Sequence, residues 1–152
     1  MHIETIQDIV EWSAAFHRSF RTHLQASVAT SQDERAKMLS HYIGDHQLNL
    51  AKTIDALTPT ESANALGTWC TEYFNEQPLP NTAKIDPRWA ELSADEIFSE
   101  VNGIYEQLVD LYRYLLSRCA ATPASETLQQ LIDIHEHQLK LMAHSVNRLQ
   151  DI

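Results

Sequence analysis

The chain has 152 residues, which suits a single domain with its own hydrophobic core over residues 1–152. Eleven Lys and Arg stand against 21 Asp and Glu, and this net charge of −10 excludes the dense basic surface that binds nucleic acid or anionic membranes. No apolar run is long enough to cross a bilayer, and residues 1–11 show no basic segment ahead of an apolar block. We therefore expect a cytoplasmic protein.

Helix-start signals divide the chain into segments. In a capping box, a hydroxyl side chain caps a backbone N–H three residues on, and an acid at that position reaches back. This pattern begins at Thr5, Ser31, Thr58 and Ser93. The Thr122-Pro123 pair marks a fifth start, because proline at the first helical position sacrifices no hydrogen bond. The sequence predicts helices over 4–29, 32–57, 59–76, 93–119 and 123–151.

The four long segments each carry one apolar stripe of helical period, and no useful alternation of strand type occurs. Four such helices predict an all-α four-helix bundle. Histidines interrupt the stripe near the middle of three helices, at His17, His46 and His135. On the second helix we assign the stripe as Leu39, Ile43, His46, Leu50, Thr53 and Leu57.

The connection from Thr58 to Leu92 is far longer than the usual link between antiparallel helices. Its first part is predicted to form a short extra helix, and its second part contains three prolines and is expected to be extended. Sixteen extended residues span up to about 50 Å, and a 26-residue helix is about 40 Å long. The sequence thus predicts one long crossover between the second and third long helices, pinned by Leu79, Ile85, Trp89 and Leu92.

This layout resembles the ferritin-like superfamily, whose di-iron members have Glu on two helices and Glu-x-x-His on the other two. Here His46-x-x-Asn49 and His135-x-x-Gln138 stand in place of Glu-x-x-His, and His17 stands at the level of a Glu. The resemblance therefore implies the bundle and its crossover without a di-iron centre.

The histidine layer is the one place where the sequence suggests chemistry. Its candidate members are His17, His46, His135, Asn49, Gln138, Tyr42 and Tyr105. Three readings stay open: a polar core or ligand-orienting layer, a three-histidine site for a single divalent metal such as Zn, Ni or Fe, and catalysis without metal. His23, His41, His137 and His144 lie off the stripes and are expected to be solvated.

Two helix-interior glycines, Gly44 and Gly103, lie near the level of the histidines. Each costs about 1 kcal/mol relative to Ala, so they either allow close approach or a small guest, or are simply tolerated. Trp12, Trp69 and Trp89 are expected near the exterior, where some of them would be buried in a homodimer.

Nothing in the sequence indicates a nucleophile or a phosphate-binding loop. We expect a non-catalytic ferritin-like bundle that acts as a binding or assembly module, with no cofactor and with an unidentified small ligand or protein as partner. The alternative is a mono-metal bundle enzyme that uses His17, His46 and His135 as ligands.

Overall fold

The computed structural model describes residues 5–57, 72–73, 75, 87–119 and 124–150. Four long helices form a bundle, as predicted: α1 (Ile6–Val28), α2 (Glu34–Asp55), α4 (Ala94–Cys119) and α5 (Ala124–Gln150). A short 3₁₀ helix, η2 (Pro87–Glu91), precedes α4. None of the helices in the described part of the chain is long and apolar enough to cross a membrane.

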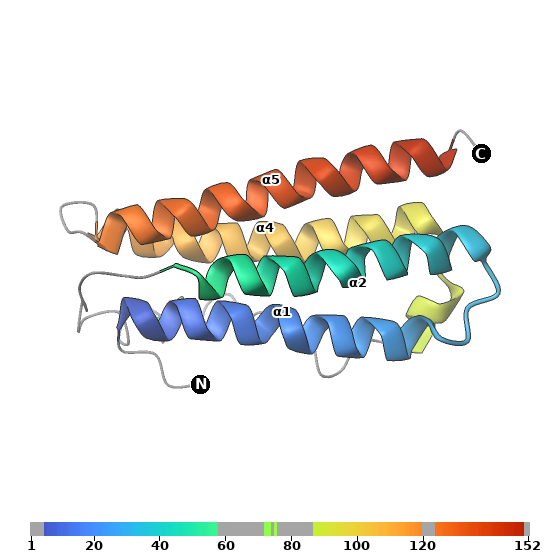
Figure 1. Ribbon diagram of the computed structural model, residues 1–152, viewed down its shortest axis with the longest axis horizontal. Coiled ribbons are helices and arrows are strands. Elements are labelled where there is room, and N and C mark those ends of the chain that lie inside the picture. Colours follow the sequence, from blue (N-terminus) through green and yellow to red (C-terminus); the bar gives the residue numbers. More distant parts are fainter. Residues whose placement is uncertain (1–4, 58–71, 74, 76–86, 120–123, 151–152) are drawn as a thin grey trace.

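The helices pack as two antiparallel pairs. α1 lies mainly against α2, α4 lies mainly against α5, and α2 also contacts both α4 and α5. Figure 1 shows that α2 and α4 run in the same direction, opposite to α1 and α5. The core between the pairs is filled by side chains from all four helices, including Ile9, Phe20, Leu39, Ile43, Leu50, Ile97, Leu108, Leu111, Leu128 and Leu131.

Two of the predicted capping boxes are confirmed. Thr5 Oγ1 accepts from Asp8 N at 3.1 Å while Asp8 Oδ2 accepts from Thr5 N at 3.0 Å. Ser93 and Glu96 make the same exchange at the start of α4, with both distances 3.2 Å. These side chains satisfy backbone donors that a helix start leaves open. The starts predicted at Thr58 and Thr122 lie outside the described residues.

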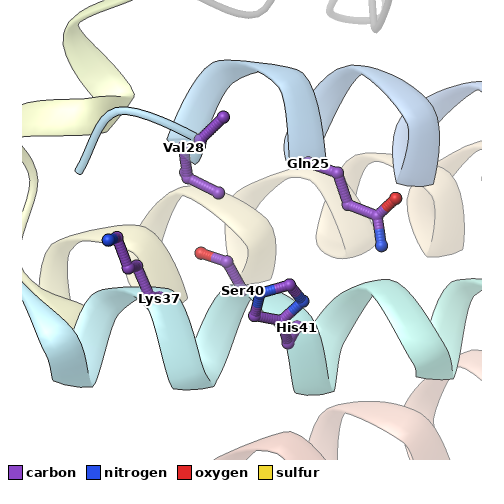
Figure 2. Close-up of a pocket in the computed structure, with 6 residues that line it drawn as sticks. Gln25, Val28, Lys37, Ser40 and His41 are labelled. Atoms are coloured by element: carbon purple, nitrogen blue, oxygen red, sulfur yellow. The ribbon is translucent and has the colours of Figure 1, made fainter.

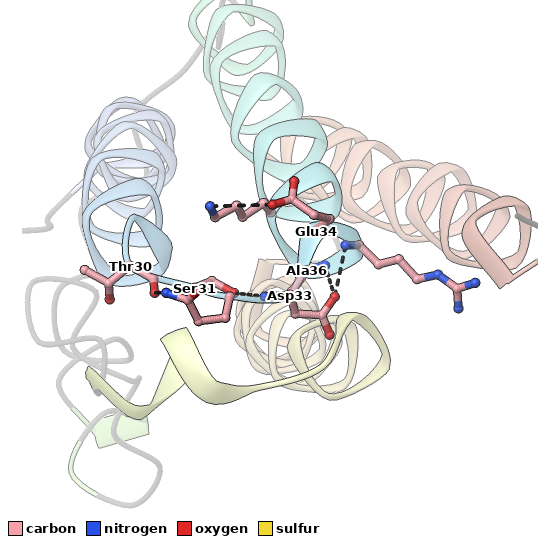
Figure 3. Close-up of polar contacts among 8 residues, drawn as sticks. Thr30, Ser31, Asp33, Glu34 and Ala36 are labelled. Carbon is pink, nitrogen blue, oxygen red and sulfur yellow. Dashed lines mark hydrogen bonds and ion pairs between the residues drawn. The ribbon is translucent and has the colours of Figure 1, made fainter.

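The start of α2 differs from the prediction. Asp33, and not Ser31, is the N-cap, and its Oδ1 accepts from Arg35 N at 2.9 Å and from Ala36 N at 3.1 Å (Figure 3). Ser31 Oγ instead accepts from Asp33 N at 3.3 Å, in the turn that precedes the helix. A carboxylate also interacts favourably with the positive end of the helix dipole, so Asp33 displaces the start from residue 32 to Glu34.

The connection between α2 and α4 contacts the bundle at two described places. Tyr73 is buried beside Tyr114 of α4, with ring centroids 5.2 Å apart. Trp89 of η2 is buried against Phe20 of α1, with centroids 6.5 Å apart. Leu79 and Ile85 lie outside the described residues, as does most of the helix predicted over 59–76, of which 72–73 and 75 are helical.

Candidate functional site

A layer of four polar side chains crosses the middle of the bundle, with one member from each long helix. His17 comes from α1, Gln47 from α2, Tyr105 from α4 and His135 from α5. All four are wholly buried. Each lies on the core-facing side of its helix, so the same packing that buries the aliphatic residues buries these polar groups. We call these four residues the histidine layer.

The histidine layer is joined by short hydrogen bonds. His17 Nε2 lies 2.8 Å from His135 Nε2, and His17 Nδ1 lies 2.6 Å from the side-chain amide of Gln47. The other end of that amide lies 2.6 Å from the Tyr105 hydroxyl. His135 Nδ1 lies 2.6 Å from the Leu131 carbonyl oxygen. These contacts form one chain from α4 through α2 and α1 to α5, so the layer ties together all four helices.

The backbone carbonyl of Leu131 fixes where the protons lie. A carbonyl only accepts, so His135 Nδ1 carries a proton and donates to it. Burial lowers the pKa of His135 to about 4, against the opposing effect of this backbone hydrogen bond. His135 is therefore neutral near pH 7, its Nε2 has a free lone pair, and His17 Nε2 donates to it.

His17 is neutral as well, because burial and the neighbouring His135 hold its pKa well below the ordinary value of 6.5. With its proton on Nε2, His17 accepts at Nδ1, so the NH₂ end of the Gln47 amide must donate to it. The two ends of an amide have nearly the same shape and are assigned from such networks. The structure places Gln47 Oε1 toward His17 Nδ1 and Gln47 Nε2 toward the Tyr105 hydroxyl. Turning this amide by 180° lets Nε2 donate to His17 and Oε1 accept from Tyr105, so that every bond in the chain has one donor and one acceptor.

Two buried tyrosines are involved here: Tyr105 belongs to the layer, and Tyr112 borders it. Burial raises the pKa of both Tyr105 and Tyr112 well above its ordinary value, so both remain hydroxyl donors near neutral pH. Tyr112 and Ser13 are hydrogen-bonded at 2.7 Å through their hydroxyl groups, and the Tyr112 ring lies 5.0 Å from the His135 ring. This second buried pair adds a link between α1 and α4 beside the layer.

The predicted site residues separate into three groups. His17, His135 and Tyr105 meet in the histidine layer. His46 is half-buried elsewhere: its Nδ1 lies 2.7 Å from Gln138 Oε1, and its ring lies 4.2 Å from the Tyr42 ring. Asn49 is exposed.

Gln47, which the sequence reasoning missed, takes the core position expected for His46. The buried residues of α2 include Leu39, Ile43, Gln47, Leu50 and Ile54. This stripe is also built from steps of three and four residues, so spacing alone does not distinguish it from the assigned one. The sequence differs at the end of the two stripes: the one through Gln47 ends at the apolar Ile54, whereas the assigned one includes the polar Thr53. In the structure Ile54 is buried and Thr53 is exposed.

The layer does not assemble the three-histidine ligand set. It brings two imidazoles together, with an amide and a phenol, and His46 belongs to the other group. All four nitrogens of these two imidazoles already take part in hydrogen bonds. Among the described residues, no group of three or more His, Cys, Asp or Glu is placed to hold a metal ion. The residues present therefore do not fit a tetrahedral site with three imidazoles.

The other histidines and the one cysteine with a described position lie away from the layer. His41, His137 and His144 are exposed, as expected for positions off the stripes, whereas His23 is half-buried. Cys119 is buried, and burial raises the pKa of its thiol, which makes it a poor nucleophile near neutral pH. Cys70 lies outside the described residues.

Three cavities lined by described residues all lie outside the layer. One is between α1 and α2, one is beside the turn from α1 to α2 and η2, and one is between α4 and α5. None is lined by a member of the histidine layer, and each member is wholly buried. Comparison of the chain with protein-family models, with curated proteins and with solved structures gave no match.

Proposed function

We propose that the protein is a non-catalytic helical bundle that acts as a binding or assembly module. The observation that carries this proposal is the closed histidine layer. His17 and His135, the residues best suited to chemistry, are wholly buried, neutral and engaged at every nitrogen. A catalytic imidazole must reach a substrate proton directly or through one water, and neither imidazole has an open path.

The test of this function is the metal content of the purified protein. We expect substoichiometric Zn, Ni and Fe in protein prepared without added metal, in the wild type and in a His135→Gln variant alike. The alternative, a mono-metal enzyme, requires about one metal ion per chain that is lost in His135→Gln. The exposed His144 supplies the matched control, since His144→Gln leaves the layer intact and must keep any metal that the layer holds.

We propose a ferritin-like topology with a crossover between α2 and α4. The shared direction of these two helices in Figure 1 supports it, as do the contacts of Tyr73 with α4 and of Trp89 with α1. Spin labels at positions 33, 56, 94 and 118 test it: the crossover requires 33 near 94 and 56 near 118. A short distance between 56 and 94 contradicts it.

We propose further that the module assembles as a homodimer. Trp89 packs inside the chain, so of the two tryptophans with a described position it is Trp12, half-buried beside Phe16 with ring centroids 5.5 Å apart, that offers an interface. Trp69 lies outside the described residues. A dimer in sedimentation experiments, weakened by Trp12→Gln, supports this assignment; a monomer at high micromolar concentration contradicts it. The cytoplasmic location stays a prediction.

A further inference from the structure

The contact between the second half of α1 and the first half of α2 differs from the rest of the molecule in charge. No Asp or Glu occurs between Glu11 and Asp33, or between Glu34 and Asp45. The same two stretches contain Arg18, Arg21, Arg35 and Lys37. In a chain of net charge −10, these two stretches carry no carboxylate of their own, although Arg18 pairs with Asp55 and Lys37 with Glu34 at their borders. Such a region favours a bound anion more than the rest of the chain does.

A cavity of about 290 Å³ lies in this contact, shown in Figure 2. Val28, the last residue of α1, and Ala29, which caps that helix, line it with apolar surface. Its polar lining consists of Gln25 of α1 and Lys37, Ser40 and His41 of α2. In Figure 2 the side chains of Gln25, Ser40 and His41 reach into the space between the two helices. The volume is at the lower end of the range for small-molecule sites, so the occupant has only a few carbon atoms.

The hydrogen bonding of this contact is incomplete. Ser40 is 1% exposed, and its hydroxyl has no hydrogen-bond partner. Arg21 Nε is also buried without a partner, and the Arg21 side chain lies against the same stretch of α2 as Gln25. These are the two such side-chain atoms among the described residues. An unmade buried hydrogen bond costs about 1–3 kcal/mol, so two in one contact call for a missing acceptor.

Gly44 keeps the amide of Gln25 at the edge of the cavity. A Cβ at position 44 would lie 3.2 Å from Gln25 Nε2 and 3.8 Å from Arg21 Cγ. Any larger residue would push Gln25 away from α2. The helix-interior glycine that the sequence left unexplained thus makes room for a polar side chain that lines the cavity.

Lys37 is available to a ligand. Its one recorded ion-pair partner is Glu34, with Nζ and Oε1 3.9 Å apart, and the Glu34 side chain is 82% exposed. Exposed pairs of this kind contribute only about 0–1 kcal/mol and are easily exchanged. The cavity lining therefore includes one lysine and no carboxylate, together with amide, hydroxyl and imidazole groups. A single lysine matches a monoanion better than a phosphate dianion.

We propose that the cavity between α1 and α2 binds a small monocarboxylate. Its carboxylate lies at Lys37 and Ser40, and its short apolar chain lies against Val28 and Ala29. This inference rests on the proposed function in one respect only: it names a ligand class for a binding module. It requires nothing of the histidine layer.

The experiment is a titration of the full chain with butyrate, followed by ¹H–¹⁵N spectra at constant ionic strength. Butyramide has nearly the same shape without the charge, and inorganic phosphate supplies a more highly charged anion. We expect saturable shifts of the Val28, Lys37 and Ser40 amides with butyrate, none with butyramide and weaker shifts with phosphate. The absence of saturable butyrate shifts overturns the proposal, as does equal binding of butyramide or tighter binding of phosphate.

Two variants and one control sharpen the test. Lys37→Met should abolish saturable binding, and Ser40→Ala should weaken it by about tenfold, the effect of one hydrogen bond to a charged group. Ser40→Ala should not lower the melting temperature of the free protein, because it removes a hydroxyl that has no partner. Lys52→Met, an exposed charge removed elsewhere on α2, should leave binding unchanged. Unaltered butyrate affinity in Lys37→Met and Ser40→Ala contradicts the proposal.

The two proposals fail separately. Stoichiometric metal in the purified protein overturns the non-catalytic function and leaves the butyrate result standing. A metal-free protein that does not bind butyrate loses only the inference about the cavity.

Discussion

The same two helices hold two polar regions that are organised in opposite ways. In the histidine layer, His17 and Gln47 are buried and every recorded contact pairs a donor with an acceptor. In the contact one to two turns away, Ser40 and Arg21 each bury an atom that has no partner. A buried hydrogen-bond network in which every group has a partner makes a fold more rigid. A buried polar group without a partner needs an explanation, and a ligand that supplies the partner is one. The difference supports a structural role for the histidine layer and a binding role for the cavity between α1 and α2.

The layer fixes how the helices lie against one another. It takes one residue from each long helix, and its bonds are 2.6–2.8 Å long, so a shift of one helix along its axis would break at least one of them. Apolar packing alone tolerates such shifts more readily, because hydrophobic contacts have little directional preference. Buried polar groups serve the same purpose in coiled coils, where a single one sets the register.

Acidification should show the largest effect. The pKa of His135 in the folded protein is about 4, below the ordinary 6.5, and that of His17 is also lowered. The unfolded chain therefore takes up protons first as the pH falls. The contribution of His135 to the free energy of unfolding is fully present above pH 6.5 and is lost as the pH falls toward 4. His135 alone accounts for about 3 kcal/mol, at about 1.4 kcal/mol per pKa unit.

Urea denaturation between about pH 7.5 and about pH 4.5 measures this loss, with His135→Gln as the control. The variant is less stable at neutral pH but should lack the His135 part of the slope between pH 6.5 and 5, where most carboxylates are still ionised. Equal slopes for the two proteins in that interval would show that His135 titrates normally.

Breaking the histidine layer should lower the free energy of unfolding more than breaking the half-buried pair of His46 and Gln138. His17→Leu leaves His135 Nε2 and one end of the Gln47 amide without partners. We expect a loss of about 2 kcal/mol in the free energy of unfolding, because leucine packing offsets part of the cost. His46→Leu affects a partly exposed contact with Gln138, which water can replace, so its effect should stay within about 1 kcal/mol. Equal losses in the two variants would erase the distinction between them.

The two described glycines should respond differently to alanine. At Gly103 a Cβ meets nothing within 4 Å, so Gly103→Ala should stabilise the protein by about 0.5–1 kcal/mol through helix propensity. At Gly44 the same gain is opposed by the 3.2 Å contact with Gln25, so Gly44→Ala should stabilise less or destabilise. Thermal unfolding of both variants gives the comparison. A larger gain at Gly44 would contradict a tight contact there.

The sequence predicted the long helices because their signals are local. Apolar period and capping boxes depend on residues three or four apart, and these placed the four helices and two of their starts. The start of α2 moved because two neighbouring side chains, Ser31 and Asp33, compete to cap it, and which one wins depends on the course of the preceding turn.

The site was only partly predictable because it depends on rotation about the helix axis. His17, His135 and Tyr105 were found, since each has a clear place on its stripe. On α2, adjacent residues differ by about 100° of rotation about the helix axis. Assigning His46 instead of Gln47 to the core therefore turned the predicted buried face of α2 by that angle. The cavity between α1 and α2 was not predicted, since it requires knowing which residues of two helices face each other.

The most direct test of the closed layer is the protonation state of its imidazoles, read from ¹⁵N chemical shifts of histidine side chains near pH 7. We predict neutral rings near pH 7, with His135 protonated on Nδ1 and His17 protonated on Nε2, and with the His135 ring unchanged down to about pH 5. His135→Gln and His17→Gln spectra assign the signals. An imidazolium at either residue near pH 7, or His135 protonated on Nε2 alone, would contradict the directed chain of hydrogen bonds on which the account rests.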